Sequence, residues 1–239
     1  TAKKKTHPLK TIKILCRNKY FILITLAFAV IYTSLGLTGG SRIYYAKYVL
    51  GDEMLNSTMT MFNYIPTILT IMLIPVFTKR FGKIKALFVG FLFYAAGLVL
   101  EIAGPVNLPM IYTGLVLQGI GHAALYSCLF AIVGDVVDYS EWKDGIREEG
   151  ITYSVTSFGQ KIGTGLGTAA LGWILAAGHY DGTAAVQSAS AIFAIKGLFL
   201  YLPLVITVIV LIIWYLFMGI DKIYPTVRKE LDERREKAE

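Results

Sequence analysis

Residues 135–173 read DVVDYSEWKDGIREEGITYSVTSFGQKIGTGLGTAALGW, a charged stretch followed by an apolar run of helical length. The apolar run carries one lysine, Lys161, about ten residues inside it. A charge that deep in a bilayer costs at least about 2.5 kcal/mol, and such residues usually face a bundle interior or a wet cavity. We therefore expect Lys161 to mark a polar pathway. The alternatives are that it snorkels to an interface or pairs with a buried carboxylate.

On a helical wheel at about 100° per residue, this run has two distinct faces. Side chains with hydroxyl groups lie within about 60° of Lys161; they are Ser154, Ser157, Thr164 and Thr168. Glycines lie on roughly the opposite side, at positions 159, 163 and 167. Small residues four apart let two membrane helices approach closely. The pattern predicts a helix that packs through its glycines and offers hydroxyls and an ammonium group to a substrate.

The composition is that of an integral membrane protein. Of the 239 residues, 55% are hydrophobic and 16% are charged, and the mean hydropathy is +0.60. Runs of about 18 or more nearly uncharged residues are long enough to cross a bilayer as helices. We predict an all-α membrane protein with six such helices, at residues 20–37, 57–77, 86–103, 108–133, 151–177 and 192–218. The two cysteines are isolated and predict neither a disulfide framework nor a metal site.

Basic residues gather on one side of the predicted spans. With a cytoplasmic N-terminus, the cytoplasmic segments hold 19 of the 23 Lys and Arg residues, and the opposite side holds three. This bias predicts a plasma-membrane protein with both termini in the cytoplasm. It also explains the net charge of +7 without a nucleic-acid partner. Residues 1–19 are interpreted as a cytoplasmic basic linker, residues 20–218 as the helical domain and residues 219–239 as a cytoplasmic tail, helical at least in part.

Two other predicted spans carry polar side chains at helical spacing. The second span holds Asn63 among threonines, and the fourth holds Gln118, His122 and Tyr126, spaced by four. Residues four apart stack on one face of a helix. Such stripes either line a cavity or form hydrogen bonds between packed helices, so Asn63, His122 and Tyr126 are candidates for substrate contact. Glu101 lies near the end of the third span. It is either an intramembrane acid or a carboxylate that snorkels to the interface, and we favour snorkelling.

The segment 134–150 is rich in charged residues and is predicted to be a cytoplasmic loop. The spacing of its carboxylates does not match a calcium-binding loop. A run of charged residues most often forms a surface exposed to solvent. We favour an ion-pair latch that opens and closes during transport, formed by Asp135, Asp138, Glu141 and Arg147. The chain carries no nucleophile elbow, zinc-binding helix, phosphate-binding glycine loop or dinucleotide fingerprint, so we do not expect an enzyme.

Several of these segments together resemble a known family. DVVDYSEWKDGIREEG followed by YSVTSFGQKIGTGLG is similar to the region joining the tenth and eleventh helices of the glycoside–pentoside–hexuronide:cation symporters. That family includes the melibiose and lactose permeases and belongs to the major facilitator superfamily. NKYFILITLAFAV and YYAKYVLGD resemble the start of its seventh helix and the loop beyond it, and KRFGKIK resembles its basic turn between helices eight and nine. The similarity covers nearly the whole chain.

The resemblance implies that the chain is the C-terminal half of a twelve-helix transporter, in which two six-helix halves rock around a site at the membrane midplane. The lysine of FGQK, here Lys161, lies at the family's sugar and cation site. Ser157 takes a polar position near the sugar, and Tyr126 takes an aromatic position nine residues before the D-V-V-D-Y motif. The missing initiator methionine agrees with a fragment.

The partners implied are a sugar or glycoside, membrane lipid and the N-terminal half of the same transporter. No cofactor is implied except a coupling cation (Na⁺, Li⁺ or H⁺), whose carboxylate ligands lie mainly in the N-terminal half. Two alternative functions stay open. One is a lysolipid carrier of the same fold, which would need a wide apolar cleft, and the other is a membrane sensor or scaffold that transports nothing.

Overall fold

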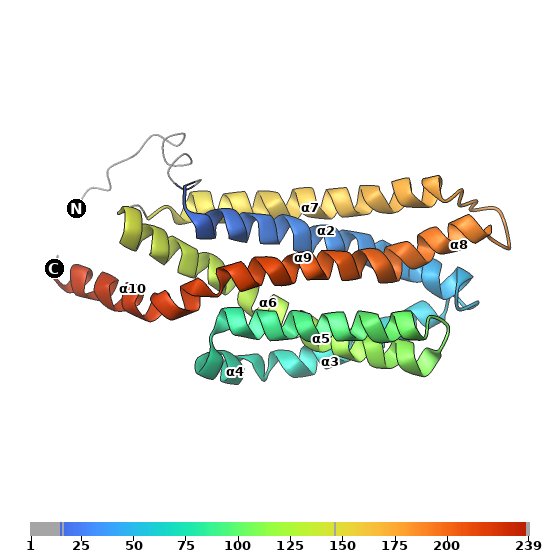
Figure 1. Ribbon diagram of the computed structural model, residues 1–239, viewed down its shortest axis with the longest axis horizontal. Coiled ribbons are helices and arrows are strands. Elements are labelled where there is room, and N and C mark those ends of the chain that lie inside the picture. The colour runs from blue at the N-terminus through green and yellow to red at the C-terminus, as the bar shows by residue number, and fades with distance from the viewer. Residues whose placement is uncertain (1–14, 16, 146, 238–239) are drawn as a thin grey trace.

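The computed structural model describes residues 15, 17–145 and 147–237, and within them every regular element is helical, as predicted. The long helices run along the long axis of the molecule (Figure 1). In chain order the elements are α2 (Lys19–Tyr48), α3 (Leu55–Ile71), α4 (Ile74–Phe81), α5 (Lys83–Ala103), α6 (Leu108–Asp144), α7 (Glu149–Ala177), α8 (Ala189–Lys196), the π-helical turn η1 (Gly197–Tyr201), α9 (Leu202–Phe217) and α10 (Gly219–Glu236).

Most of these helices are suited to cross a membrane. Among the described residues, four helical segments are long and apolar enough to do so, namely α2, α5, α6 and the rod of residues 189–236 built from α8, η1, α9 and α10. The pair α3 and α4, bent by 55° at a short break, is a fifth candidate. Helix α7 has 29 residues but is not among these candidates. The chain is therefore a multi-pass membrane protein by helix length and composition.

Two segments that the sequence predicts as loops are helical instead. Helix α2 continues through Gly39 and Gly40 to Tyr48. Gly40 serves packing there, because a Cβ atom at this position would lie 2.5 Å from the Leu171 side chain of α7. Helix α6 runs through most of the charged segment and ends at Gly145, whose φ of 67° is a left-handed conformation that favours glycine. The connection between α6 and α7 is therefore much shorter than the predicted loop of residues 134–150.

A break divides the predicted second span. Helix α3 ends at Ile71 and α4 begins at Ile74, with the 55° bend between them. Pro75 stands in the first turn of α4, where a missing N–H group leaves no helical hydrogen bond unmade. Pro66 lies inside α3, and the helix continues past it. The bend therefore belongs to the second proline of the span, Pro75.

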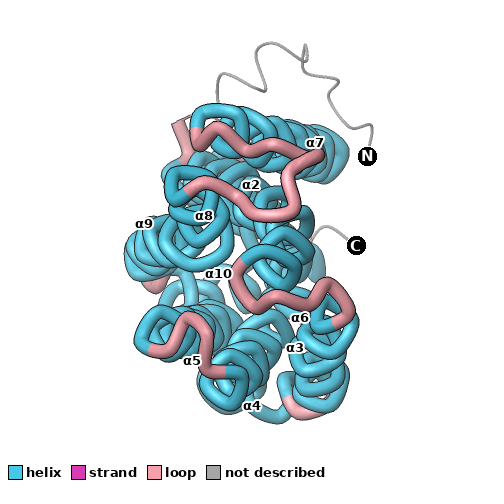
Figure 2. Tube along the Cα trace, turned by 90° about the vertical axis from the view of Figure 1, so that its right-hand side faces the viewer, coloured by secondary structure: helices cyan, strands magenta, loops and turns pink. Residues whose placement is uncertain are grey.

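The predicted glycine face of α7 packs against α2. Figure 2 looks along the bundle and places these two helices side by side. Gly159, Gly163 and Gly167 are buried. A Cβ atom at Gly163 would meet the backbone oxygen of Ala29, and one at Gly167 would meet that of Thr33. Only glycine allows the two backbones to come this close, so the prediction of a close-packing glycine seam is confirmed.

The C-terminal segment also packs on the bundle. Residues 219–236 form the helix predicted for the tail, and Val227 and Leu231 are buried on its inner side. Trp142, in the last turns of α6, donates a hydrogen bond of 2.7 Å from Nε1 to Oε2 of Glu230. The start of α2, the end of α6 and α10 thus lie at the same end of the molecule (Figure 1). Asn18 reinforces this arrangement, because its side chain caps α2 and donates to Ser140 Oγ of α6 at 2.8 Å.

Candidate functional site

A polar pocket of about 240 Å³ lies between α2, α3 and α6. It is lined by residues that include Thr38, Arg42, Thr60, Asn63, Tyr64, His122 and Tyr126. Three of the predicted site residues, Asn63, His122 and Tyr126, therefore meet in one cavity. Their juxtaposition agrees with the polar stripes seen in the sequence, while their contact with a substrate stays a prediction.

Asn63 and His122 fix each other across the interface of α3 and α6. The amide nitrogen of Asn63 donates to the backbone oxygen of Leu115 at 3.2 Å, and its Oδ1 lies 3.3 Å from Nδ1 of His122. An amide oxygen only accepts, so Nδ1 of His122 carries the proton in this arrangement. The other ring nitrogen of His122 is then free to accept a hydrogen bond.

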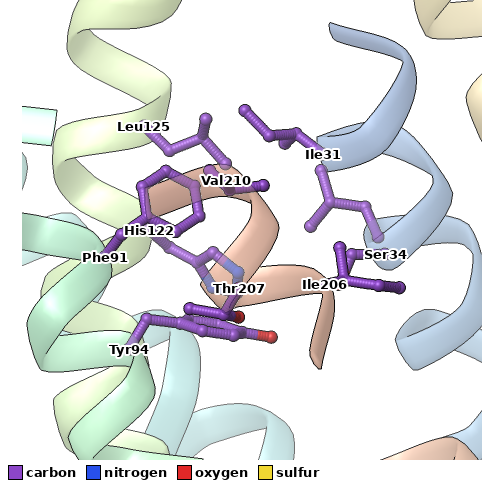
Figure 3. A pocket seen from close by; sticks show the side chains of 10 residues that line it. Ile31, Ser34, Phe91, Tyr94, His122, Leu125, Ile206, Thr207 and Val210 are labelled. Atoms are coloured by element: carbon purple, nitrogen blue, oxygen red, sulfur yellow. The ribbon is translucent and has the colours of Figure 1, made fainter. Parts of the chain in front are cut away.

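Aromatic rings surround His122. The Tyr94 ring lies 5.0 Å from it on one side, and the Tyr126 ring lies 5.8 Å away. Figure 3 shows the His122 and Tyr94 rings side by side, facing Ile31 and Ser34 of α2 across a small cavity. That cavity has a volume of about 20 Å³, enough for one water molecule. His122 lines both this cavity and the larger polar pocket, so its ring stands between a polar space and a mostly apolar one.

Arg42 is a pocket residue that the sequence analysis missed. Arg42 lies between the first two predicted spans, residues 20–37 and 57–77, and was therefore expected outside the helices. The first helix instead continues to Tyr48 and carries the Arg42 side chain into the pocket. Its Nη1 donates to Thr60 Oγ1 at 3.1 Å. A useful signal was present in the sequence, since Thr38 and Arg42 are four apart and therefore lie on one face if the run is helical.

Lys161 and Ser157 line a different groove, of about 410 Å³, together with Tyr153, Ser154 and Phe158. The ammonium group is on the exposed face of α7, opposite the glycine seam, as the helical wheel predicts. No ion pair of Lys161 occurs among the described residues, so pairing with a buried carboxylate of this segment is not observed. Thr164 is exposed one turn further on, and its hydroxyl donates to the backbone oxygen of Gln160 at 3.0 Å. Neither Lys161, Ser157 nor Thr164 lines the pocket of His122.

Arg147 is the centre of an ion-pair cluster at the end of α6. Its Nη1 lies 2.9 Å from Asp138 and 2.6 Å from Glu141, and its Nη2 lies 2.5 Å from Glu149. Hydrogen bonding, first to Glu141 and then to Glu149 and Asp138, raises the pKa of the Arg147 guanidinium, which therefore stays charged at any physiological pH. The predicted association of Arg147 with Asp138 and Glu141 is thus present, and its opening during transport stays a prediction.

Asp135 has another partner. Its two carboxylate oxygens accept hydrogen bonds from Lys83 Nζ at 2.6 and 2.8 Å, which ties the start of α5 to α6. Asp135 was predicted to belong to the same latch as Arg147, but it forms a separate ion pair with Lys83. The two pairs remain neighbours, since Asp135, Asp138 and Arg147 line one pocket of about 240 Å³ with Tyr224. The Tyr224 hydroxyl donates to Asp138 Oδ2 at 2.9 Å.

Glu101 does not reach the membrane interface. Its side chain is 0% exposed, and Oε1 accepts a hydrogen bond of 2.7 Å from Nε2 of Gln118. Gly114 leaves the room for it, because a Cβ atom there would lie 2.6 Å from Glu101 Cγ. The expectation of snorkelling was wrong, since Glu101 is buried against α6, where Gln118 binds Oε1 and Gly114 leaves space for the side chain, while Oε2 has no hydrogen-bond partner among the described residues.

Long apolar helices with polar cavities between them define a multi-pass helical membrane protein. Comparison with known families is more specific. Residues 1–222 match the model of the family described as MFS/sugar transport protein, so this chain belongs to that family of transporters of the major facilitator superfamily. Members of the family are transporters and not enzymes.

Known proteins agree with this assignment. The chain is 31% identical over 237 residues to the isoprimeverose transporter of Lactiplantibacillus pentosus, covering 97% of this chain and 48% of that protein. It is 27% identical over 229 residues to a glucuronide carrier protein homolog of Escherichia coli K12, covering 95% of this chain and 49% of that protein. It is 32% identical over 166 residues to a putative sulfoquinovose importer of Salmonella typhimurium LT2, covering 67% of this chain and 35% of that protein. The chain therefore spans about half the length of the relatives that it matches.

Proposed function

We propose that this chain is the C-terminal half of a twelve-helix secondary transporter that moves a glycoside, pentoside or hexuronide together with a cation by alternating access. The observation that carries the proposal is the polar pocket of Asn63, His122 and Tyr126, enclosed by helices of a sugar-transport family. Such pockets between membrane helices are where transporters bind their substrates. A chain that covers half of each full-length relative agrees with one of two halves.

The proposal requires six helical segments that cross the membrane. Helix α7 has to be one of them, although it is not among the candidates by length and composition. Its 29 residues span about 43 Å at 1.5 Å per residue, which exceeds the roughly 30 Å of a bilayer core. The sequence of α7 is less hydrophobic than those of the candidate spans because it contains several glycines and a polar face that holds Lys161. The glycine seam against α2 supports a transmembrane position, because close backbone packing is how membrane helices associate.

Lys161, Ser157 and Thr164 then form the surface that faces the other half of the transporter. An uncovered ammonium group at mid-helix would be costly against lipid and is acceptable beside a wet substrate path. In this arrangement Lys161 acts at the sugar and cation site, with the coupling cation (Na⁺, Li⁺ or H⁺) bound mainly by the N-terminal half. Tyr126, 44% exposed, supplies a ring on which a sugar can stack.

The end of the molecule that holds Lys83, Arg147 and α10 is the cytoplasmic end in this proposal. It carries the basic residues that the positive-inside rule assigns to the cytoplasm. Residues 1–19, most of which lie outside the described part, act as a linker from the N-terminal half. Residues 219–239 form a cytoplasmic tail, and the protein resides in the plasma membrane. The cluster of Asp138, Glu141 and Arg147 closes the path on this side.

Uptake into proteoliposomes tests the proposal. The full-length transporter that contains this chain is reconstituted, and entry of radiolabelled methyl glucoside, methyl xyloside and methyl glucuronide is measured under Na⁺, Li⁺ or H⁺ gradients, with empty liposomes as the control. We expect accumulation of at least one of these sugars that depends on one cation gradient. Movement of lysolipid but no sugar would favour the lipid carrier, and movement of neither would favour a sensor or scaffold.

A further inference from the structure

Arg42 lines the polar pocket, and no acidic side chain from the described part of the chain lines that pocket with it. It lies on α2, one turn beyond Thr38, and its guanidinium reaches across to α3, where Nη1 donates to Thr60 Oγ1 at 3.1 Å. Its Nε is buried and has no hydrogen-bond partner among the described residues. A buried donor without a partner is costly, and a buried charged donor is more so. The described residues therefore do not provide acceptors for all the hydrogen-bond donors of this guanidinium.

The lining of the pocket offers no counter-charge. Among the described residues that line it, Arg42 is the one Lys or Arg, and none is an aspartate or glutamate. Glu101 of α5 does not line the pocket; its Oε1 accepts a hydrogen bond from Gln118, and no ion pair with Arg42 occurs among the described residues. A half-buried guanidinium whose pocket contains no carboxylate among its described lining residues attracts an anion from outside.

The groups around Arg42 suit an oxyanion on a sugar-sized molecule. A guanidinium presents its donors as a planar fork that matches the two oxygens of an acid group. Tyr64 and Tyr126 supply hydroxyl donors and aromatic faces to the same pocket. Thr60 takes one N–H of Nη1, so the two terminal nitrogens of Arg42 keep three further N–H donors that can form the fork. The apolar parts of the rings can contact the carbon face of a sugar, while the fork takes the acid.

We propose that this pocket binds the acid group of an anionic sugar through Arg42, so that the transporter prefers a sugar carboxylate or sulfonate to the neutral sugar. The inference rests on the proposed transport function and narrows its substrate class. Lys161, in the separate groove on α7, keeps its role at the sugar and cation site. Arg42 thus acts as a specificity-determining residue, with Thr60 as the group that orients its guanidinium.

Transport of matched acid and neutral sugars tests this inference. In proteoliposomes of the full-length transporter, we compare kcat/KM for methyl glucuronide, methyl sulfoquinovoside and methyl glucoside. The wild-type protein should favour at least one acid over the glucoside by about tenfold or more, the effect of one charged hydrogen bond. Arg42→Gln should remove this preference by lowering the ratio of kcat/KM for the acids to kcat/KM for the glucoside about tenfold or more. Arg42→Lys should retain part of the preference, because it keeps the charge and loses the fork.

Arg80→Gln is the matched control, since Arg80 is an exposed arginine on α4 outside the pocket and should change neither substrate. A wild-type protein that transports the glucoside as well as both acids would overturn the inference and leave the proposed function intact. An Arg42→Gln protein that loses acid and neutral sugars equally would also overturn it. If the Arg42→Gln protein does not insert into the membrane, the inference stands or falls on whether the wild-type protein prefers the acid sugars to the glucoside. A protein that transports no sugar would overturn both proposals.

Discussion

The amide oxygen of Asn63 lies 3.3 Å from Nδ1 of His122, and this contact joins α3 to α6 inside the membrane domain. The same side chain also donates to the Leu115 backbone oxygen at 3.2 Å. One asparagine therefore both holds two helices together and sets the orientation of a pocket histidine.

Replacing Asn63 should affect both stability and sugar binding. Asn63→Ala removes the two interhelical hydrogen bonds, which are worth about 0.6 kcal/mol each in membrane proteins, and it frees the His122 ring to rotate. We expect a decrease of about 1 kcal/mol in the free energy of unfolding and a several-fold weaker sugar affinity. Thermal unfolding in detergent and sugar binding by calorimetry measure the two effects. Thr113→Ala, an exposed threonine on α6, is the control. Unchanged sugar affinity in Asn63→Ala would exclude Asn63 from the site.

The glycine seam predicts opposite outcomes for two neighbouring glycines. Gly163→Ala places a methyl group against the Ala29 backbone oxygen and should separate α7 from α2, at a cost of about 1–3 kcal/mol. Gly165→Ala meets nothing within 4 Å and should be neutral or slightly stabilising. Thermal unfolding of the two variants in the same detergent makes the comparison. Equal melting temperatures would contradict the close packing of α2 and α7.

The arginine latch predicts a change in access from the cytoplasm. Tyr153 lines both the pocket beside Arg147 and the groove of Lys161, so the two spaces adjoin. Arg147→Ala should open this end and increase the alkylation rate of Ser157→Cys by a membrane-impermeant maleimide severalfold, in a background lacking Cys16 and Cys128. The reagent is applied to inside-out vesicles. Arg235→Ala, which removes a more exposed partner of Glu141, should change the rate little. An unaltered rate in Arg147→Ala would contradict the latch.

The stability of the fold should depend more on the size and shape of the Glu101 side chain than on its charge. In Glu101→Gln the amide oxygen can still accept from Gln118, whereas Glu101→Ala leaves Gln118 unpaired beside a cavity. We expect Glu101→Ala to lower the free energy of unfolding by about 2 kcal/mol or more and Glu101→Gln to lower it much less. Melting temperatures of the two purified variants provide the test. Equal damage by both would mean that the fold needs a carboxylate at this position.

Features set by residue type and local spacing could be predicted from the sequence. The glycine face of α7 follows from a four-residue repeat, and the position of Lys161 opposite the glycines follows from the same wheel. The association of Arg147 with Asp138 and Glu141 follows from charges that are near one another in the chain. Each of these needs no knowledge of which helix lies next to which.

Features set by contacts between distant segments could not be predicted. Gly40 packs against the Leu171 side chain of α7 within a continuous helix, although a Gly-Gly pair favours a turn in isolation. Burial of Glu101 depends on a recess formed by Gln118 and Gly114 on another helix. The wheel likewise gives the direction of Lys161 around α7, but not that its groove is separate from the pocket of His122.

The central claim is that the exposed face of α7 lines a sugar path, and Lys161→Ala in the full-length transporter tests it most directly. Cation-driven accumulation of radiolabelled sugar in membrane vesicles should fall to the background level, while the amount of inserted protein stays the same. Lys47→Ala, at an exposed lysine on α2, should accumulate sugar normally. Normal accumulation by Lys161→Ala would contradict the account.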